Sequence, residues 1–334
     1  MSEVNEKTPL LEVRNLRKLF AGKSSFFQKD KSWIKAVDDV SFTLNPKETL
    51  GVVGESGCGK STMGRSVLRL IEPTSGEIFY KGKDFTKASG QELRKMRADM
   101  QIIFQDPYAS LNPRMTIGEI IAEPLNIQKR YKTQEETRAQ VLKVMEVVGL
   151  NTKYYNRYPH EFSGGQRQRI GIARAIVLNP SLVVCDEPVS ALDVSIQAQI
   201  LNLLQDLKEQ MGLTFIFITH DLSVVNHFAD EIAVMYLGQL IEKAPTEELF
   251  DHPIHPYTRA LLSAIPIPEV GISRPERILL KGEISSPIDP PDECRFAKRC
   301  IYTCDQCHQS CPKLMEVRPG HFVSCHLWKD FLSE

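Results

Sequence analysis

The chain passes from an apolar strand into a helix through Gly54-Glu55-Ser56-Gly57-Cys58-Gly59-Lys60-Ser61-Thr62. Residues 49–53 before this loop are mostly apolar, and residues 61–71 after it have helical spacing that stops before Pro73. The loop fits the pattern G-x-x-x-x-G-K-[ST] in the strand-to-helix context that the motif requires. The sequence therefore predicts a phosphate-binding loop.

The residue types of this loop suit a nucleotide. Glycines let several backbone N–H groups turn toward one point, and the positive end of the following helix adds to the attraction for phosphate. Lys60 would bring its charge to the β- and γ-phosphates, and the Ser61 hydroxyl would be a Mg²⁺ ligand. The alternative is a glycine-rich turn without a ligand, and the flanking strand and helix argue against it.

An acidic pair, Asp186-Glu187, follows the apolar run 182–185. Such a run is typical of a strand covered on both faces, and α/β proteins place ligand chemistry at the carboxyl ends of such strands. Asp186 would hold Mg²⁺, directly or through water, and Glu187 would orient or deprotonate the attacking water. The alternative is that the two carboxylates only cap a helix.

Strands and helices alternate along most of the chain, which indicates an α/β fold with a mainly parallel sheet. We expect strands at residues 10–16, 36–44, 49–53, 100–104, 182–185 and 213–218, and helical segments at 61–71, 116–150, 165–178 and 194–211. A helical block at about 107–162 interrupts this order, and within it Thr133 and Glu136 fit a capping box and Gly149 a C-terminal stop. Periodicity fades after Phe250, so we expect domains at 1–250 and 251–334.

Composition excludes several classes of protein. The chain has 334 residues, 42% hydrophobic and 25% charged, which is typical of a soluble globular protein of about two domains. Its formal charge of −1 argues against nucleic-acid binding, because proteins that bind nucleic acid usually carry an excess of positive charge. No apolar run approaches the roughly 18–20 residues of a membrane span. Residues 1–9 are polar and contain no signal-peptide core, so we expect the chain to stay in the cytoplasm.

A second glycine motif, Phe162-Ser163-Gly164-Gly165-Gln166, opens the helix expected at 165–178. Together with the phosphate loop and the acidic pair, it resembles the signature of ABC-transporter ATPases. The resemblance implies a P-loop NTPase cassette with an antiparallel N-terminal β-subdomain and an inserted helical subdomain. It also implies ATP and Mg²⁺ as cofactors. In the family, ATP held by the loop of one subunit is sandwiched against the signature of the other, so Ser163, Gly164, Gly165 and Gln166 would bind it there.

Other positions match the family in order. Gln105 resembles the glutamine that contacts Mg²⁺ and water and links to the membrane partner. His220 resembles the switch histidine on the γ-phosphate, and Asp193, at the end of Ser190-Ala191-Leu192-Asp193, resembles a loop residue that faces the partner across the dimer.

The resemblance thus implies two sets of functional residues. Glu187, His220 and Gln105 would be catalytic, and Ser61, Gln105 and Asp186 would be the Mg²⁺ ligands. Phe20 is the candidate for the aromatic ring that stacks on adenine, although a phenylalanine here can also be a core residue.

Two further segments narrow the resemblance to peptide-importer ATPases, most closely to the F-type subunit of an oligopeptide system. They are residues 106–116, Asp-Pro-Tyr-Ala-Ser-Leu-Asn-Pro-Arg-Met-Thr, and residues 255–262, His-Pro-Tyr-Thr-Arg-Ala-Leu-Leu. The resemblance implies a D-type ATPase partner, two transmembrane permease subunits and an extracytoplasmic peptide-binding protein. The chain would lie peripherally on the cytoplasmic face of the inner membrane and power import of oligopeptides or dipeptides.

Two alternatives stay open. A related importer, for nickel, glutathione or antimicrobial peptides, would share the cassette and much of the tail. A soluble ABC ATPase acting on nucleic acid or ribosomes is more remote, because the chain has one cassette, no heptad run and a formal charge of −1.

Six of the eight cysteines crowd the last segment: Cys294, Cys300, Cys304, Cys307, Cys311 and Cys325. In a chain without a signal peptide this crowding favours a metal or cluster site over disulfides. Cys294, Cys300, Cys307 and Cys325 resemble the tail of peptide-importer ATPases that carry a structural [4Fe–4S] cluster. Cys304 and Cys311 depart from that pattern. Tetrahedral Zn²⁺, with His308, His321 or His326 among its ligands, is one alternative, and six thiols without a metal are the other.

Overall fold

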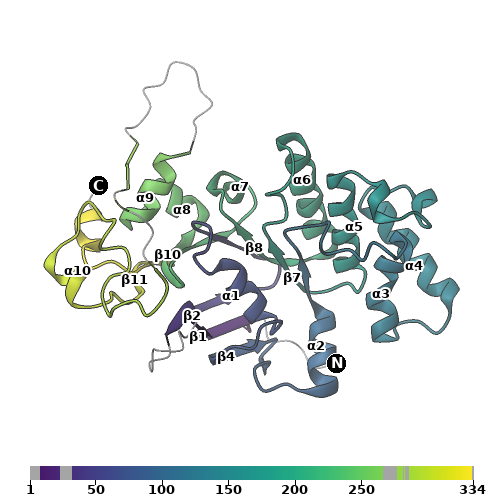
Figure 1. Ribbon diagram of the computed structural model, residues 1–334, viewed down its shortest axis with the longest axis horizontal. Helices are drawn as coiled ribbons and strands as arrows, with labels where there is room; N and C mark the ends of the chain where they lie inside the picture. The colour runs from purple at the N-terminus through teal and green to yellow at the C-terminus, as the bar shows by residue number, and fades with distance from the viewer. Residues whose placement is uncertain (1–7, 23–31, 266–276, 281, 283–285, 333–334) are drawn as a thin grey trace, which may run out of the picture. The chain divides into compact units, whose positions relative to one another are not determined.

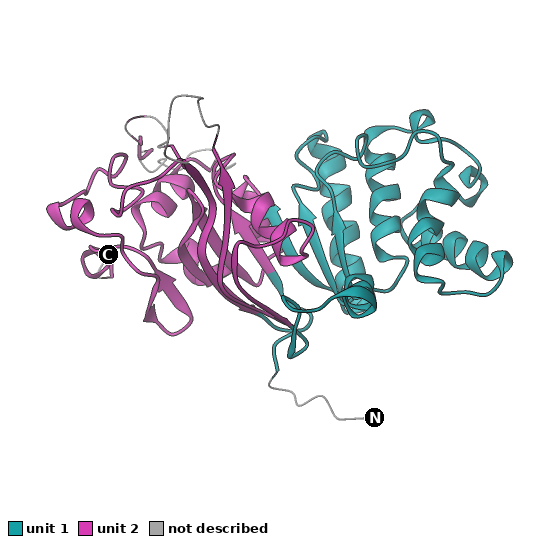
Figure 2. Ribbon diagram, turned by 60° about the horizontal axis from the view of Figure 1, so that its bottom comes forward, with its two compact units in different colours: residues 1–10, 44–49, 80–218 teal, residues 11–43, 50–79, 219–334 magenta. Residues whose placement is uncertain are grey.

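The computed structural model describes residues 8–22, 32–265, 277–280, 282 and 286–332. Figure 1 labels its α-helices and several of its strands. The chain forms two compact units, each built from separate stretches of sequence (Figure 2): residues 1–10, 44–49 and 80–218 make unit 1, and residues 11–43, 50–79 and 219–334 make unit 2. The expected domains at 1–250 and 251–334 remain predictions. Within the described ranges, no helix is both long and apolar enough to cross a membrane.

The sheet of unit 1 is parallel. It consists of β6 (Met100–Ile103), β7 (Leu182–Asp186) and β8 (Thr214–Thr219), in the order β8-β7-β6. Met100 pairs with Leu182, and Leu182 pairs with Thr214. Both β7 and β8 are buried along their whole length, as the apolar runs predicted. The carboxyl ends of β6 and β7 therefore lie at the same edge of the sheet, where the chain continues into Gln105 and Glu187.

The helical part of unit 1 differs from its prediction in two places: α2 (Gly90–Asp99) was not among the expected elements, and residues 116–150 are not one segment. The expected segment 116–150 is two helices, α3 (Ile117–Gln128) and α4 (Gln134–Val147). Lys129 ends α3 with a left-handed φ of 51°, and Thr133 begins α4 with the predicted capping box to Glu136. Gly149, with φ 71°, follows α4 as expected. The remaining elements of unit 1 are β5 (Lys83–Asp84), α2 (Gly90–Asp99), η1 (Thr152–Tyr154), η2 (Pro159–Glu161), α5 (Gly164–Ile176) and α6 (Val194–Met211).

Helix packing in unit 1 is centred on α5. Helix α3 packs against both α4 and α5, and α5 packs against α6 and β6. The bounds of α6 are those expected, because Gly212, with a left-handed φ of 65°, ends it. The segment after Gln105 is tied to α5 as well, since the Arg174 guanidinium donates to the Ser110 carbonyl at 2.6 Å.

Unit 2 contains most of a mixed sheet in the order β11-β12-β10-β9-β3. Its strands are β3 (Thr49–Val53), β9 (Glu231–Tyr236), β10 (Gln239–Pro245), β11 (Met315–Arg318) and β12 (His321–Val323). β3 and β9 are parallel and the other neighbours are antiparallel. The last strands of the chain thus extend the sheet that carries β3. A separate sheet holds β2 (Trp33–Leu44), β1 (Leu11–Ala21) and β4 (Ser75–Tyr80), in that order.

Helix α1 (Lys60–Val67) is shorter than the expected segment 61–71. Arg69 adopts a left-handed φ of 51°, and the Leu70 N–H donates to the Arg65 carbonyl at 2.8 Å. This closes the helix as a Schellman turn does, but without the glycine that usually reveals it in a sequence. The other helical elements of unit 2 are α7 (Leu222–Asn226), α8 (Thr246–Asp251), α9 (Pro256–Ser263), α10 (Asp305–Gln309) and η3 (Trp328–Phe331).

A buried carboxylate on β10 fastens the last segment of the chain to unit 2. Glu242 has no exposed surface. It accepts hydrogen bonds from the N–H groups of Ile254 (2.7 Å) and His255 (3.1 Å), and His321 Nε2 lies 2.9 Å from its Oε1. Burial lowers the pKa of His321, but the hydrogen bonds and charges of Glu242 and Glu248 raise it above its usual value overall. A buried charge with this many partners is strongly held in place.

Candidate nucleotide site

The phosphate loop, Gly54 to Thr62, lies in unit 2 between β3 and α1, as the sequence predicted. Gly54 and Gly59 have φ values of 152° and 107°, which side chains rarely permit. A Cβ on Gly54 would lie 2.3 Å from the Met235 carbonyl oxygen, and one on Gly59 would lie 2.0 Å from the Ala36 carbonyl oxygen. The glycines therefore allow the loop to curl tightly against neighbouring backbone.

Lys60 is almost entirely buried in the loop. Its ammonium donates to the carbonyl oxygens of Gly54 (2.7 Å) and Glu55 (2.9 Å). Gly59, the N-cap of α1, has no side chain that could accept the first N–H groups of the helix. A cationic group and the positive end of a helix thus converge on one loop, which is the chemistry of an anion site.

Unit 1 brings together Gln105 and Glu187, two of the predicted catalytic residues. The Gln105 amide Nε2 donates to Glu187 Oε2 at 2.8 Å. Glu187 has a left-handed φ of 48°, and its N–H donates to the Ile218 carbonyl on β8 at 3.0 Å. Non-glycine residues with such backbone angles gather at functional sites, where the surrounding structure holds them. The neighbouring Asp186 ends β7 and is buried.

The second glycine motif opens α5. Ser163 is the N-cap: its Oγ accepts from the Gln166 N–H at 3.4 Å, and Gln166 Oε1 accepts from the Ser163 N–H at 3.1 Å. This reciprocal pair is a capping box. Ser163, Gly164 and Gln166 are exposed, so this helix N-terminus is accessible to a ligand brought from outside the unit.

Gly165 fixes the second motif against the following helix. A Cβ at this position would meet Ile196 Cγ2 at 2.5 Å, so only a glycine allows the approach of α5 to α6. The N-cap of α6 is Asp193, which is exposed, and the next residue, Val194, is 81% exposed. The motif and Asp193 are therefore held together on unit 1.

Two more predicted residues lie in unit 2. His220 follows β8 and is exposed. Asp221 beside it caps α7 by accepting from the Ser223 N–H at 2.9 Å. Phe20 lies near the end of β1 with 37% of its surface exposed, and the Lys18 ammonium is 5.0 Å from its ring centre. The exposed ring is compatible with stacking, and the adenine role stays a prediction.

The fold has close counterparts among solved structures. An ATP-binding cassette in a dimeric post-hydrolysis state bound to ADP and Pi matches with a TM-score of 0.63 and 30% identity, covering 71% of this chain and 98% of that one. A second dimeric structure, of a bacterial ABC transporter cassette, matches with a TM-score of 0.62 over the same shares. The α/β cassette fold predicted from the motifs is confirmed.

The ABC transporter family matches residues 37–190, and the C-terminal region of oligopeptide/dipeptide transporters matches residues 241–307. The oligopeptide transport ATP-binding protein AppF of Bacillus subtilis is 52% identical over 98% of this chain and 100% of its own length. The dipeptide transport ATP-binding protein DppF of Haemophilus influenzae is 52% identical over 97% and 98%. The chain belongs to the ATP-binding subunits of the oligopeptide/dipeptide ABC transporters. The predicted resemblance to this family is confirmed.

The match to the cassette covers the phosphate loop, Gln105, the second glycine motif and the acidic pair. Asp193 and His220 lie outside both matched ranges, so their assignment rests on their place in this sequence and fold. Cys294, Cys300 and Cys307 lie within the match to the transporter C-terminal region, and Cys325 lies beyond it.

The cysteines of the family's C-terminal region are all free thiols. Cys304 and Cys307 have their sulfurs 3.5 Å apart. Burial raises the pKa of Cys294 to about 12, with further contributions from nearby Cys307 and Cys325. Burial likewise raises the pKa of Cys325 to about 12, with contributions from nearby Cys300 and Cys307. The four predicted cluster ligands are thus linked by these electrostatic effects.

The thiols do not converge on a single ion. Within the ranges that the structure describes, no three His, Cys, Asp or Glu side chains form a group that could hold one metal ion. Neither the predicted cluster nor the zinc alternative is confirmed by this arrangement.

Sequence reasoning missed one set of contacts at the loop. The Glu55 carboxylate is bound by Arg299, and the Glu55 N–H donates to the Tyr257 hydroxyl at 3.0 Å. In the sequence, Tyr257 belongs to the segment 255–262 and Arg299 directly precedes Cys300. No sequence signal pairs residues that are this far apart.

Proposed function

We propose that this chain is the ATP-hydrolysing subunit of a membrane importer for oligopeptides or dipeptides. The observation that carries the proposal is the phosphate loop, in which buried Lys60 and the start of α1 converge on a glycine-lined cradle. Family membership supplies the transport context, since the relatives are named as oligopeptide and dipeptide transport ATP-binding proteins.

In this proposal the loop of unit 2 binds the triphosphate. On binding, Lys60 exchanges its bonds to the loop's own carbonyls for bonds to phosphate oxygens, which are charge-assisted and therefore stronger. The N–H groups at the start of α1 bind the same phosphates, and the Phe20 ring stacks on adenine. His220 donates to the γ-phosphate.

Glu187 and Gln105 are the residues that act on water. Glu187 orients the attacking water or accepts its proton, and Gln105 holds the carboxylate through the 2.8 Å bond. Ser61, Asp186 and Gln105 carry the oxygen donors that Mg²⁺ prefers. When bound, Mg²⁺ neutralises charge that develops on the phosphates.

The exposed N-terminus of α5 supports a dimeric arrangement. Ser163, Gly164, Gly165 and Gln166 would contact ATP held by the partner subunit, with Asp193 facing the same partner. We propose a D-type ATPase as this partner, with two permease subunits and an extracytoplasmic peptide-binding protein completing the importer. The chain would lie on the cytoplasmic face of the inner membrane.

We also propose a structural [4Fe–4S] cluster on Cys294, Cys300, Cys307 and Cys325. In support of this set, after the larger effect of burial, Cys307 and Cys325 raise the pKa of Cys294, and Cys300 and Cys307 raise the pKa of Cys325. The four cysteines supply the four thiolates that a [4Fe–4S] cluster requires. Bound there, it would cross-link segments of the last part of the chain.

Reconstitution tests the function. The subunit would be combined with its D-type partner, the permeases and the binding protein in proteoliposomes, and ATP hydrolysis would be measured with and without peptide. We expect hydrolysis stimulated by peptides and abolished by Glu187→Gln. Stimulation by nickel or glutathione instead would assign the chain to a related importer, and absence of any hydrolysis would refute the proposal.

Anaerobic purification tests the cluster. We expect a brown protein with broad absorption and about four irons per chain. A colourless protein with about one zinc would replace the cluster with a zinc site, and metal-free thiols would refute both.

A further inference from the structure

The Cys294–Cys300 segment carries an arginine that binds the phosphate loop. The Arg299 guanidinium, in a residue only 8% exposed, donates from Nη1 to Glu55 Oε2 at 2.7 Å and from Nη2 to Glu55 Oε1 at 2.9 Å. This two-bond geometry fixes both the position and the plane of the carboxylate. Tyr236 lies alongside, with its ring centre 5.8 Å from the guanidinium carbon of Arg299.

Glu55 connects this arginine to the phosphate-binding lysine. Its side chain is held by Arg299, its N–H donates to the Tyr257 hydroxyl, and its carbonyl oxygen accepts from Lys60 at 2.9 Å. One residue of the loop is therefore fixed at three points. A displacement of Glu55 would displace a carbonyl that positions Lys60.

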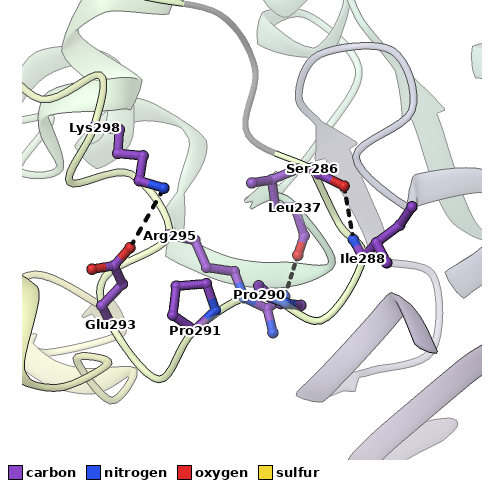
Figure 3. Close-up of a pocket in the computed structure, with 8 residues that line it drawn as sticks. All are labelled: Leu237, Ser286, Ile288, Pro290, Pro291, Glu293, Arg295 and Lys298. Atoms are coloured by element: carbon purple, nitrogen blue, oxygen red, sulfur yellow. Dashed lines mark hydrogen bonds and ion pairs between the residues drawn. The ribbon is translucent and has the colours of Figure 1, made fainter. Parts of the chain in front are cut away.

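A second arginine of the same segment binds beside a residue that contacts the loop. Figure 3 shows Arg295 beside Pro290 and Pro291, with its guanidinium bound to the Leu237 carbonyl oxygen. Arg295 also binds the Asp38 carboxylate. Gly238, which follows Leu237 in the chain, donates its N–H to the carbonyl of the loop residue Cys58 at 2.7 Å.

The segment that carries both arginines is itself held firmly. Backbone bonds join Ala297 to Cys294 and Cys300 to Phe296, at 2.9 and 3.0 Å. Phe296 is buried and packs against the rings of Tyr236, Tyr257 and His255. The arginines thus project from a fixed support.

We propose that Arg299 is a positioning residue for nucleotide binding: by holding Glu55 it keeps the phosphate loop and Lys60 in the conformation that receives ATP. This role rests on the proposed function of the loop as an ATP site. The cysteine-bearing segment is then a support of the nucleotide site, and its integrity sets the affinity of the subunit for ATP.

The test is the affinity of the full-length subunit for labelled ATP. We expect Arg299→Gln to weaken binding about tenfold, because an unpaired Glu55 carboxylate reorients toward water and shifts the loop. Arg299→Lys keeps the charge but not the two parallel bonds, so its affinity should be intermediate. Lys298→Gln is the matched control, since Lys298 is largely exposed and lies 4.0 Å from its partner Glu293.

Two further variants separate positioning from a general loss of stability. Arg318→Gln removes an ion pair to Glu248 elsewhere in unit 2 and should lower the melting temperature without changing ATP affinity. If Arg299 acts through Glu55, Glu55→Gln/Arg299→Gln should bind ATP no more weakly than Arg299→Gln alone.

Wild-type affinity in Arg299→Gln, or additive losses in the double variant, would overturn the inference. So would equal losses in Arg299→Gln and Arg318→Gln. Failure of the unaltered subunit to bind ATP would instead refute the proposed function. If Arg299→Gln does not fold, Arg299→Lys and Glu55→Gln test the same contact, and wild-type affinity in both would overturn it.

Discussion

Two helices of this chain have glycines at their N-termini, and their first N–H groups meet different surroundings. Helix α1 starts after Gly59, which offers no side-chain cap, and buried Lys60 reaches back over the loop. Helix α5 starts at Ser163, whose own hydroxyl accepts the N–H of Gln166, and its N-terminus is exposed. The first is a complete anion cradle within one unit. The second is already capped, so we expect it to bind phosphate only when another subunit delivers it.

The largest expected effect separates binding from chemistry. Glu187→Gln should leave ATP affinity at the α1 cradle unchanged and lower hydrolysis about a thousandfold, because the carboxylate that would accept a proton is lost. Closed dimers should then accumulate with ATP, measurable by size-exclusion chromatography. Normal turnover would contradict the role of Glu187.

The second-largest expected effect is on ATP affinity at the phosphate loop before α1. Lys60→Ala should weaken binding of labelled ATP about a hundredfold, since charge-assisted bonds to the phosphates are lost. Lys87→Ala, at an exposed lysine outside the loop, is the control and should bind normally. Unchanged affinity in Lys60→Ala would mean that the loop is not the phosphate site.

A glycine exchange at each helix sharpens the comparison. Gly59→Ala should abolish ATP binding. The new Cβ would clash with the Ala36 carbonyl oxygen, and a φ of 107° is unfavourable for alanine. Because that obstacle is backbone, no second side-chain substitution should restore binding. Gly165→Ala should keep ATP binding but lose dimer-dependent hydrolysis, because its Cβ would strike Ile196 Cγ2 at 2.5 Å.

A second substitution, at Ile196, tests whether the steric clash causes the loss of hydrolysis in Gly165→Ala. Ile196→Ala removes the clashing Cγ2, so hydrolysis should recover in Gly165→Ala/Ile196→Ala relative to Gly165→Ala. Recovery is measured as ATPase activity in the reconstituted importer, with Ile196→Ala alone as the control. No recovery would show that Gly165 serves the ligand and not the packing of α5 on α6.

The smallest expected effect is at the cap of α5. Ser163→Ala should cost about 1 kcal/mol of unfolding free energy, the usual value of an N-cap, measured by denaturant titration. ATP affinity of the isolated subunit should not change, whereas hydrolysis in the dimer should fall. A loss of ATP affinity in the isolated subunit would contradict the division of labour between α1 and α5.

Local chemistry explains which predictions succeeded. The strand, loop and helix around Lys60 are encoded by neighbouring residues, and so is the capping box of Thr133 and Glu136. The helical periodicity of the sequence mispredicted the end of a helix where a single backbone φ angle ends it. Arg69 and Lys129 end their helices in left-handed conformations that favour glycine, and neither residue signals this. Strands β9 and β10 were not among the expected elements.

The sequence by itself determined the phosphate loop, the second glycine motif and the acidic pair, because each motif contains its own donors, glycines and charges within a few residues. Only the tertiary structure decided which distant residues contact these motifs and hold them in position. The bond between Gln105 and Glu187 depends on parallel pairing of β6 with β7, and the bond between Arg299 and Glu55 joins residues 244 positions apart. Such contacts arise from packing of distant segments, which no local pattern of residues records.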